Sequence, residues 1–112
     1  AGPASQVQLL NKMGIAAKMT NGVDWRAVSA DVQRGNPVTI STGGHYFTAE
    51  RVDPSNGMMD FGNSALVLTA ANGRRWFRPD EIQLLGMGDP AAAIFMDAPR
   101  SPSPSVVAGR AR

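Results

Sequence analysis

Apolar residues recur at helical spacing in two stretches near the start of the chain. In residues 5–13 they are Val7, Leu9, Leu10 and Met13. After Asp24 they are Trp25, Val28 and Val32. A spacing of three to four residues is typical of a helix with one buried face. Asp24 can cap the second helix, and Gly14 and Gly35 stand where the helices would end. The pattern predicts two short helices joined by a connector at residues 15–22.

From residue 37 onward the spacing changes to the alternation that is typical of strands. It predicts strands over residues 37–41, 45–52, 58–61 and 65–69. Gly43 and Gly44 mark one turn, and the run Asp-Pro-Ser-Asn-Gly at 53–57 marks another. Pro79 begins a short helix that ends at Leu85. Two helices followed by an antiparallel meander predict the α+β fold class.

The regular pattern ends near residue 86. We expect residues 1–86 to form the folded domain and residues 87–112 to form a Pro/Ser-rich extension, in which 91–96 is one short apolar segment. The tail, residues 98–112, cannot pack a core because it is rich in proline and serine. We therefore expect the tail to have no regular secondary structure and to become ordered only against another chain.

The composition excludes several kinds of chemistry. The chain has no cysteine, so it has no disulfide, no thiolate zinc site and no cysteine nucleophile. A single histidine, His45, is too little for a transition-metal site, and no cofactor is predicted. No apolar run approaches the ~18 residues of a membrane span, and no signal-peptide pattern is visible. We therefore expect no membrane-spanning segment.

The net charge of +2 arises in the tail. Three of the eleven basic residues lie there, namely Arg100, Arg110 and Arg112. The remaining eight face nine acidic residues, so the rest of the chain is close to neutral. Its one basic cluster, which consists of Arg74, Arg75 and Arg78, is a weak footprint for nucleic acid. We therefore expect no nucleic-acid partner.

Four short motifs follow one another along the chain. They are AGPAS at 1–5, a helix with Gly-Asn-Pro-Val at 28–38, Gly-His-Tyr-Phe at 44–47, and Asp-Phe-Gly-Asn-Ser at 60–64. In this order they resemble the bacteriocin-processing (double-glycine) peptidases of the papain-like cysteine peptidase superfamily, whose opening motif is Cys-Gly-Pro-Ala-Ser. The resemblance covers about residues 1–86. It implies a papain-like half-cleft, in which the N-terminal helices pack on a small antiparallel sheet.

The resemblance implies a site formed by Ala1 and His45. Ala1 stands at the nucleophile position, at a helix N-terminus, where the helix dipole would favour a thiolate. His45 would be the base that faces it from the start of a strand. We expect helix 5–13 to pack across the sheet of 37–41, 45–52 and 58–61, with Ala1 Cβ within about 5 Å of a ring nitrogen of His45.

A third residue of such a site would orient the histidine ring, and two residues are candidates. If residue 52 faces residue 58 across the hairpin, Asn63 comes close to His45, whereas Asp60 faces Glu50 farther away. Asn63 is therefore the first candidate, as in papain. Asp60 is the second, because the bacteriocin-processing enzymes normally use Asp. Both also suit ordinary turn chemistry.

The alanine at position 1 makes the chain inactive by this mechanism, because a methyl group cannot attack a carbonyl. The family's oxyanion donor, a glutamine upstream of the cysteine, would precede residue 1. An engineered Cys-to-Ala change, a truncation or a natural pseudo-peptidase would each explain such a domain. Because the chain lacks an initial Met and begins inside a motif, we expect a fragment or a processed product.

Two non-catalytic functions stay open. The domain can be a pseudo-peptidase that binds a peptide or protein segment in the cleft, or a purely structural module that contacts other chains of a larger assembly through residues 98–112. By analogy, phage tail proteins, including tape-measure proteins, carry peptidase-like domains of this kind, so a virion is one expected location and the cytoplasm the other. The remaining possibility is an unrelated small α+β binding module.

Overall fold

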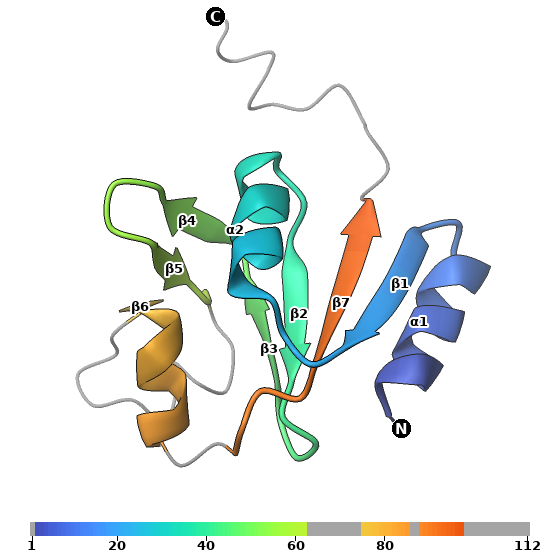
Figure 1. The fold of residues 1–112 in the computed structure, drawn as a ribbon. Coiled ribbons are helices and arrows are strands. Elements are labelled where there is room, and N and C mark those ends of the chain that lie inside the picture. Colours follow the sequence, from blue (N-terminus) through green and yellow to red (C-terminus); the bar gives the residue numbers. More distant parts are fainter. Residues whose placement is uncertain (1, 63–74, 86–87, 98–112) are drawn as a thin grey trace, which may run out of the picture.

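The structure, a computed structural model, describes residues 2–62, 75–85 and 88–97, with no side-chain description for 83–85. Within these ranges the chain forms two α-helices and two antiparallel sheets (Figure 1), which confirms the α+β fold class. The predicted strand 65–69 and the tail 98–112 lie outside the described residues.

Both predicted helices are confirmed. Helix α1 spans Pro3–Lys12 and has Gly2 as its N-cap residue and proline at its first position. Helix α2 spans Trp25–Gln33, and the carboxylate of Asp24 caps it by accepting the backbone N–H of the second and third residues that follow. They differ in packing, because α2 buries three side chains and α1 buries none.

The larger sheet has the strand order β1–β7–β2–β3. Its strands are β1 (Ala16–Asn21), β7 (Ala92–Asp97), β2 (Val38–Ser41) and β3 (Tyr46–Ala49). The smaller sheet has the order β4–β5–β6. Its strands are β4 (Arg51–Asp53), β5 (Met58–Asp60) and β6 (Trp76–Phe77). A 3-10 helix, η2 (Pro79–Leu85), follows β6 where a short helix was predicted.

The predicted single meander is wrong in three respects. The expected strand 45–52 is divided, because β3 belongs to the larger sheet and β4 to the smaller one. The expected strand 58–61 lies in the smaller sheet as β5. The connector predicted at 15–22 contains β1, an edge strand of the larger sheet.

The expected domain boundary at residue 86 also requires correction. Strand β7, residues 92–97, was placed in the extension, yet it pairs with β1 on one side and with β2 on the other. The helix α1 makes its main contacts with β1 and β7, rather than across 37–41, 45–52 and 58–61 as predicted. The pairing of β1 and β7 joins residues far apart in sequence, which local patterns do not report.

One face of the larger sheet forms the core. The cross-strand partners Phe95, Val38 and Ala49 share this face, and Val38 and Ala49 are completely buried. Phe47 on β3 contacts the ring of Phe61 edge-on at 5.4 Å and thereby links the larger sheet to the smaller one. Helix α2 covers this face and contributes Val28 and Val32 to the core.

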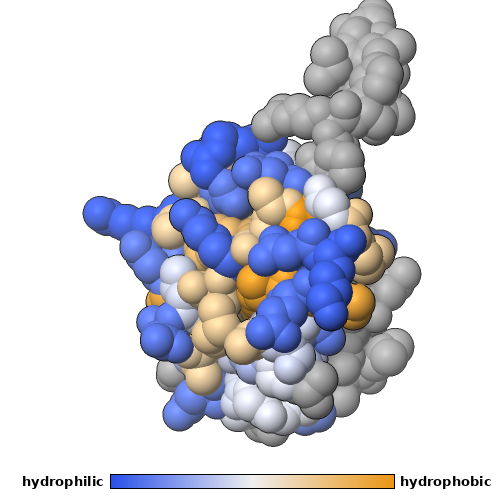
Figure 2. All heavy atoms as spheres, turned by 90° about the vertical axis from the view of Figure 1, so that its right-hand side faces the viewer, coloured by the Kyte–Doolittle hydropathy of each residue, from blue (hydrophilic) through white to orange (hydrophobic). Residues whose placement is uncertain are grey.

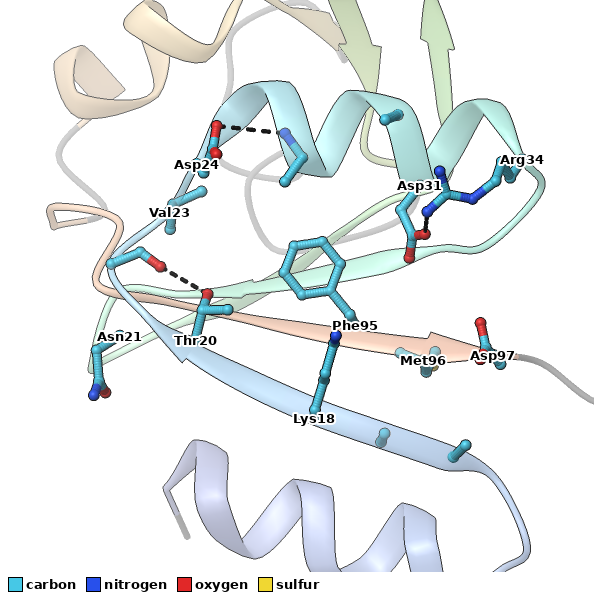
Figure 3. Close-up of a pocket in the computed structure, with 15 residues that line it drawn as sticks. Lys18, Thr20, Asn21, Val23, Asp24, Asp31, Arg34, Phe95, Met96 and Asp97 are labelled. Atoms are coloured by element: carbon cyan, nitrogen blue, oxygen red, sulfur yellow. Dashed lines mark hydrogen bonds and ion pairs between the residues drawn. The ribbon is translucent and has the colours of Figure 1, made fainter.

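Helix α1 lies on the opposite face of the larger sheet from α2 (Figure 3). Leu9 of α1 and Met13, the C-cap residue of this helix, are 53% and 65% accessible. Figure 2 views the molecule from the side of α1 and β1 and shows apolar atoms between polar side chains. Because α1 lies on the other face, the core face is left open over β1 and the adjoining side of β7, beside α2.

Candidate functional site

A groove of about 990 Å³ lies between α2 and the β1–β7 pair (Figure 3). It is the uncovered part of the core face. One wall is the side of α2 that presents Ala27 and Ala30. The other is formed by the paired strands, where Lys18 of β1 lies opposite Phe95 of β7. The groove thus continues the hydrophobic core outward to the surface.

The apolar part of the groove is centred on Phe95. This ring is half-buried and packs against the core cluster, and Val23 does the same from the loop before α2. Ala27 and Ala30 are exposed and have small side chains one helical turn apart, so they leave room beside the helix. A segment that brings apolar side chains into the groove would extend the core and remove Phe95 from water.

The acidic groups at the ends of the groove have partners of different kinds. Asp31 is buried and forms an ion pair with Arg34, which follows it by one helical turn. The carboxylate of Asp24 accepts the N–H groups at the start of α2. Asp97, on the exposed end of β7, accepts a hydrogen bond of 3.3 Å from the side-chain amide of Asn36. This amide is neutral, so among the described residues no cation pairs with the carboxylate of Asp97.

Lys18 is the basic group of the groove without a partner. Its side chain extends from β1 toward Phe95 (Figure 3). Within the part of the chain that the structure describes, its ammonium makes no hydrogen bond and no ion pair, in contrast to Arg34. The groove therefore has an apolar centre with an exposed cation at its edge.

The described residues of the groove offer binding groups and no recognisable catalytic pair. Its lining contains neither histidine nor cysteine, and the hydroxyl of Thr20 donates to the backbone oxygen of Gly22 at 3.0 Å. Among the residues that the structure describes, no group of three His, Cys, Asp or Glu side chains is placed to hold a metal ion. The groove has a volume that is typical of a binding site, and its lining combines the apolar ring of Phe95 with polar and charged side chains.

The site predicted from the motifs is described only in part. Ala1 and Asn63 lie outside the described residues, so their approach to His45 stays a prediction. His45 ends the turn between β2 and β3, where its backbone oxygen accepts the N–H of Thr42 at 3.0 Å and its own N–H donates to the hydroxyl of Thr42 at 3.2 Å. Its side chain is exposed. The turn and the N-terminal end of α1 lie toward the same end of the sheet (Figure 1).

Asp60 has partners other than His45. Its carboxylate is completely buried and accepts the N–H of Gly62 at 2.8 Å and hydrogen bonds from the side chains of Arg51 and Arg75. The hairpin register also differs by one residue from the expected one, because Arg51, and not Glu50, lies opposite Asp60. None of the described hydrogen bonds joins Asp60 to His45.

The surroundings of Asp60 have opposing effects on its pKa. Burial raises the pKa of this carboxyl, but the Gly62 N–H and the guanidinium groups of Arg51 and Arg75 lower it by more. The pKa therefore lies below its ordinary value. Arg51 also stacks over the ring of Trp76 at 5.5 Å, which holds the guanidinium in place. These contacts give Asp60 a structural role in the smaller sheet.

Sequence reasoning missed Lys18, Phe95 and Asp97 as candidate binding residues. The signal for β1 is present, because apolar Ala17 and Met19 alternate with Lys18 and Thr20. Because this segment is short and lies between Gly14 and Gly22, its pattern alone predicts a connector.

Comparison of the chain with protein-family models, with curated proteins and with solved structures found no match. The resemblance to papain-like peptidases therefore rests on the sequence motifs alone. Among the described helices, none has the length and apolar character needed to cross a membrane.

Proposed function

We propose that this domain is a non-catalytic interaction module that binds a segment of a partner protein in the groove between α2 and the β1–β7 pair. The observation that carries the proposal is the uncovered part of the core face around Phe95. Burying apolar surface is worth about 25 cal/mol per Å². A partner that covers an apolar surface joined directly to the core therefore gains binding free energy. A partner at this position agrees with a role in a larger assembly.

A selection experiment tests this proposal without assuming the sequence of the segment. A display library of random peptides would be panned against the full chain, and the selected peptides would then be measured against two variants. Ala30→Trp fills the groove from the side of α2. Gln33→Trp places the same ring on the same helix, at an exposed position that does not line the groove.

We expect Ala30→Trp to weaken binding of the selected peptides at least tenfold and Gln33→Trp to leave it unchanged. Both positions are exposed, so neither substitution should unfold the domain, and circular dichroism checks this. Selected peptides that bind the Ala30→Trp variant as tightly as the original chain would show that the groove is not the binding site.

A second candidate function, the disabled cysteine-peptidase site, is favoured by the N-terminal helix. Gly2 caps α1 and Pro3 begins it, which is the local geometry that the opening motif requires for a nucleophile. We propose that Ala1→Cys would create a thiol that alkylates faster than free cysteine near neutral pH, and that His45→Ala would remove this acceleration. Alkylation at the rate of free cysteine would rule out a disabled catalytic site.

A further inference from the structure

We propose that the segment bound in the groove is an amphipathic helix that carries one acidic and one basic residue four positions apart. Lys18 receives the acidic residue and Asp97 the basic one. This inference rests on the proposed function of the groove and specifies the partner. It follows from three properties of the groove: its backbone, its charges and the spacing between them.

The backbone of the groove favours a helical partner over an extended one. The floor is a sheet face, where the backbone groups of β7 are already paired with β1 and β2. An extended segment binds by adding a strand to an open sheet edge, which here is the outer edge of β1, and a strand added there would not cover Phe95 on β7. A helix satisfies its own backbone hydrogen bonds and needs only side-chain contacts. The partner in this groove is therefore helical.

The side of α2 that faces the groove also suits a helix. Helices pack with their axes about 8–10 Å apart, and small side chains at the contact allow the closest approach. Ala27 and Ala30 provide such a contact. Helix α2 runs along the strands (Figure 3), and a second helix beside it would lie over Phe95 in the same direction. An apolar stripe on that helix would cover Phe95.

Two charges in the groove are left for a partner. Asp31 is neutralised by Arg34, and Asp24 is engaged in capping α2. Lys18 has no ionic partner within the described residues, and Asp97 has only the neutral amide of Asn36. The groove therefore presents one cation and one anion at its rim, on two neighbouring strands.

The spacing of these two charges sets the spacing on the partner. Lys18 lies opposite Phe95, and Asp97 follows Phe95 by two residues on the same face of β7. Two residues of a strand span about 7 Å. Four residues of a helix rise about 6 Å. A helix that runs along the strands therefore brings residues i and i+4 to Lys18 and Asp97, and opposite charges at these positions match them.

Three fluorescent helical peptides of about 16 residues test the inference. They share one apolar stripe and differ at two positions four apart, which hold Glu then Lys, Lys then Glu, or two Gln residues. Fluorescence anisotropy measures their binding to the full chain. A helix that runs in the same direction as α2 passes Lys18 before Asp97 (Figure 3), so we expect the Glu-then-Lys peptide to bind about fivefold more tightly than the neutral one. The other charged peptide should bind more weakly than the neutral one.

Reversal of the two groove charges is the decisive step. The double variant Lys18→Glu with Asp97→Lys should exchange the preference between the two charged peptides. Lys12→Glu changes the same charge on α1, on the opposite face of the sheet, and should leave the preference unchanged. Equal binding of all three peptides, or a preference that the double variant does not exchange, would overturn the inference.

The outcome separates this inference from the proposed function. If Ala30→Trp abolishes binding while charge has no effect, the groove binds a partner of another kind and only the inference is wrong. A fourth peptide, residues 2–14 of this chain, carries Leu9 and Met13 but no acidic residue and tests α1 of a second copy as the occupant. If this peptide binds more tightly than either charged peptide, the inference is also overturned.

Discussion

The two halves of one sheet face have the same type of strand and very different environments. Over β2 and β3, the side chains of Val38, Ile40 and Phe47 are at most 1% exposed, because α2 and the smaller sheet cover them. Over β1 and β7, Phe95 is half-buried and Lys18 is exposed. The burial of a strand's side chains thus depends on what covers the strand, and the open half is the half available to a partner.

Truncation of one phenylalanine in each half gives the largest expected contrast. Phe47→Ala removes a completely buried ring and should lower the free energy of unfolding by about 3–5 kcal/mol. Phe95→Ala removes a half-buried ring and should lower it by about 1–2 kcal/mol. Urea unfolding of both variants measures the difference. Equal losses would mean that the two halves are equally closed in solution.

Asp60 allows a test of the smaller sheet, which helps to close the covered half. Asp60→Asn removes the charge between Arg51 and Arg75 and should lower the free energy of unfolding by about 1–3 kcal/mol. The loss is limited because the two guanidinium groups are partly exposed and can be hydrated. Urea unfolding near pH 7 measures this. A substitution without effect would show that the buried charge contributes nothing to stability.

The same carboxyl makes stability depend on pH. The pKa of Asp60 is lower in the folded than in the unfolded chain, so its stabilising effect is complete above the unfolded value of roughly 4 and is lost as the pH falls through the folded value. The pKa of Asp53 is also lowered, by hydrogen bonds from Ser55, so Asp53→Asn is the matched control. Measured by urea unfolding as the pH falls below about 4, the free energy of unfolding should decrease less steeply in Asp60→Asn than in Asp53→Asn.

The cap of α2 provides the smallest expected effect. Asp24→Ala removes the acceptor for the N–H groups of Arg26 and Ala27 and should lower the free energy of unfolding by about 1 kcal/mol. Asp24→Asn, which keeps a capping oxygen, should lower it by only a few tenths. Asp24 also lies at the end of the groove, and both variants remove its charge. A comparison of the two variants therefore separates the loss of the cap from the loss of a groove charge.

The elements that the sequence predicted are those whose signals are local. Asp24 and Gly35 bracket α2, and the turn at 53–57 joins β4 to β5 as expected. The expected and the observed hairpin registers differ by one residue, and a shift of one residue moves every side chain to the opposite face. Asp60 therefore pairs with Arg51, whereas the expected register placed it opposite Glu50.

The groove was beyond local prediction because its two strands are far apart in sequence. The strand patterns of residues 16–21 and 92–97 are each a weak signal alone, and the two segments form a surface only when β7 pairs with β1. Gly62 has a φ of +58°, in the left-handed region that favours glycine. This backbone conformation explains a glycine in the Asp-Phe-Gly-Asn-Ser motif without any catalytic role.

The central position of β7 has a consequence for the way the chain folds as it is synthesised. The ribosome makes β1, β2 and β3 first, yet β1 has no partner in the larger sheet until β7 has emerged. Early in translation the nascent chain therefore holds β1 apart from the β2–β3 hairpin, with the apolar residues of both exposed. Such late, long-range pairing slows folding and favours association with chaperones. A stall just before β7 would leave an intermediate that is prone to aggregate.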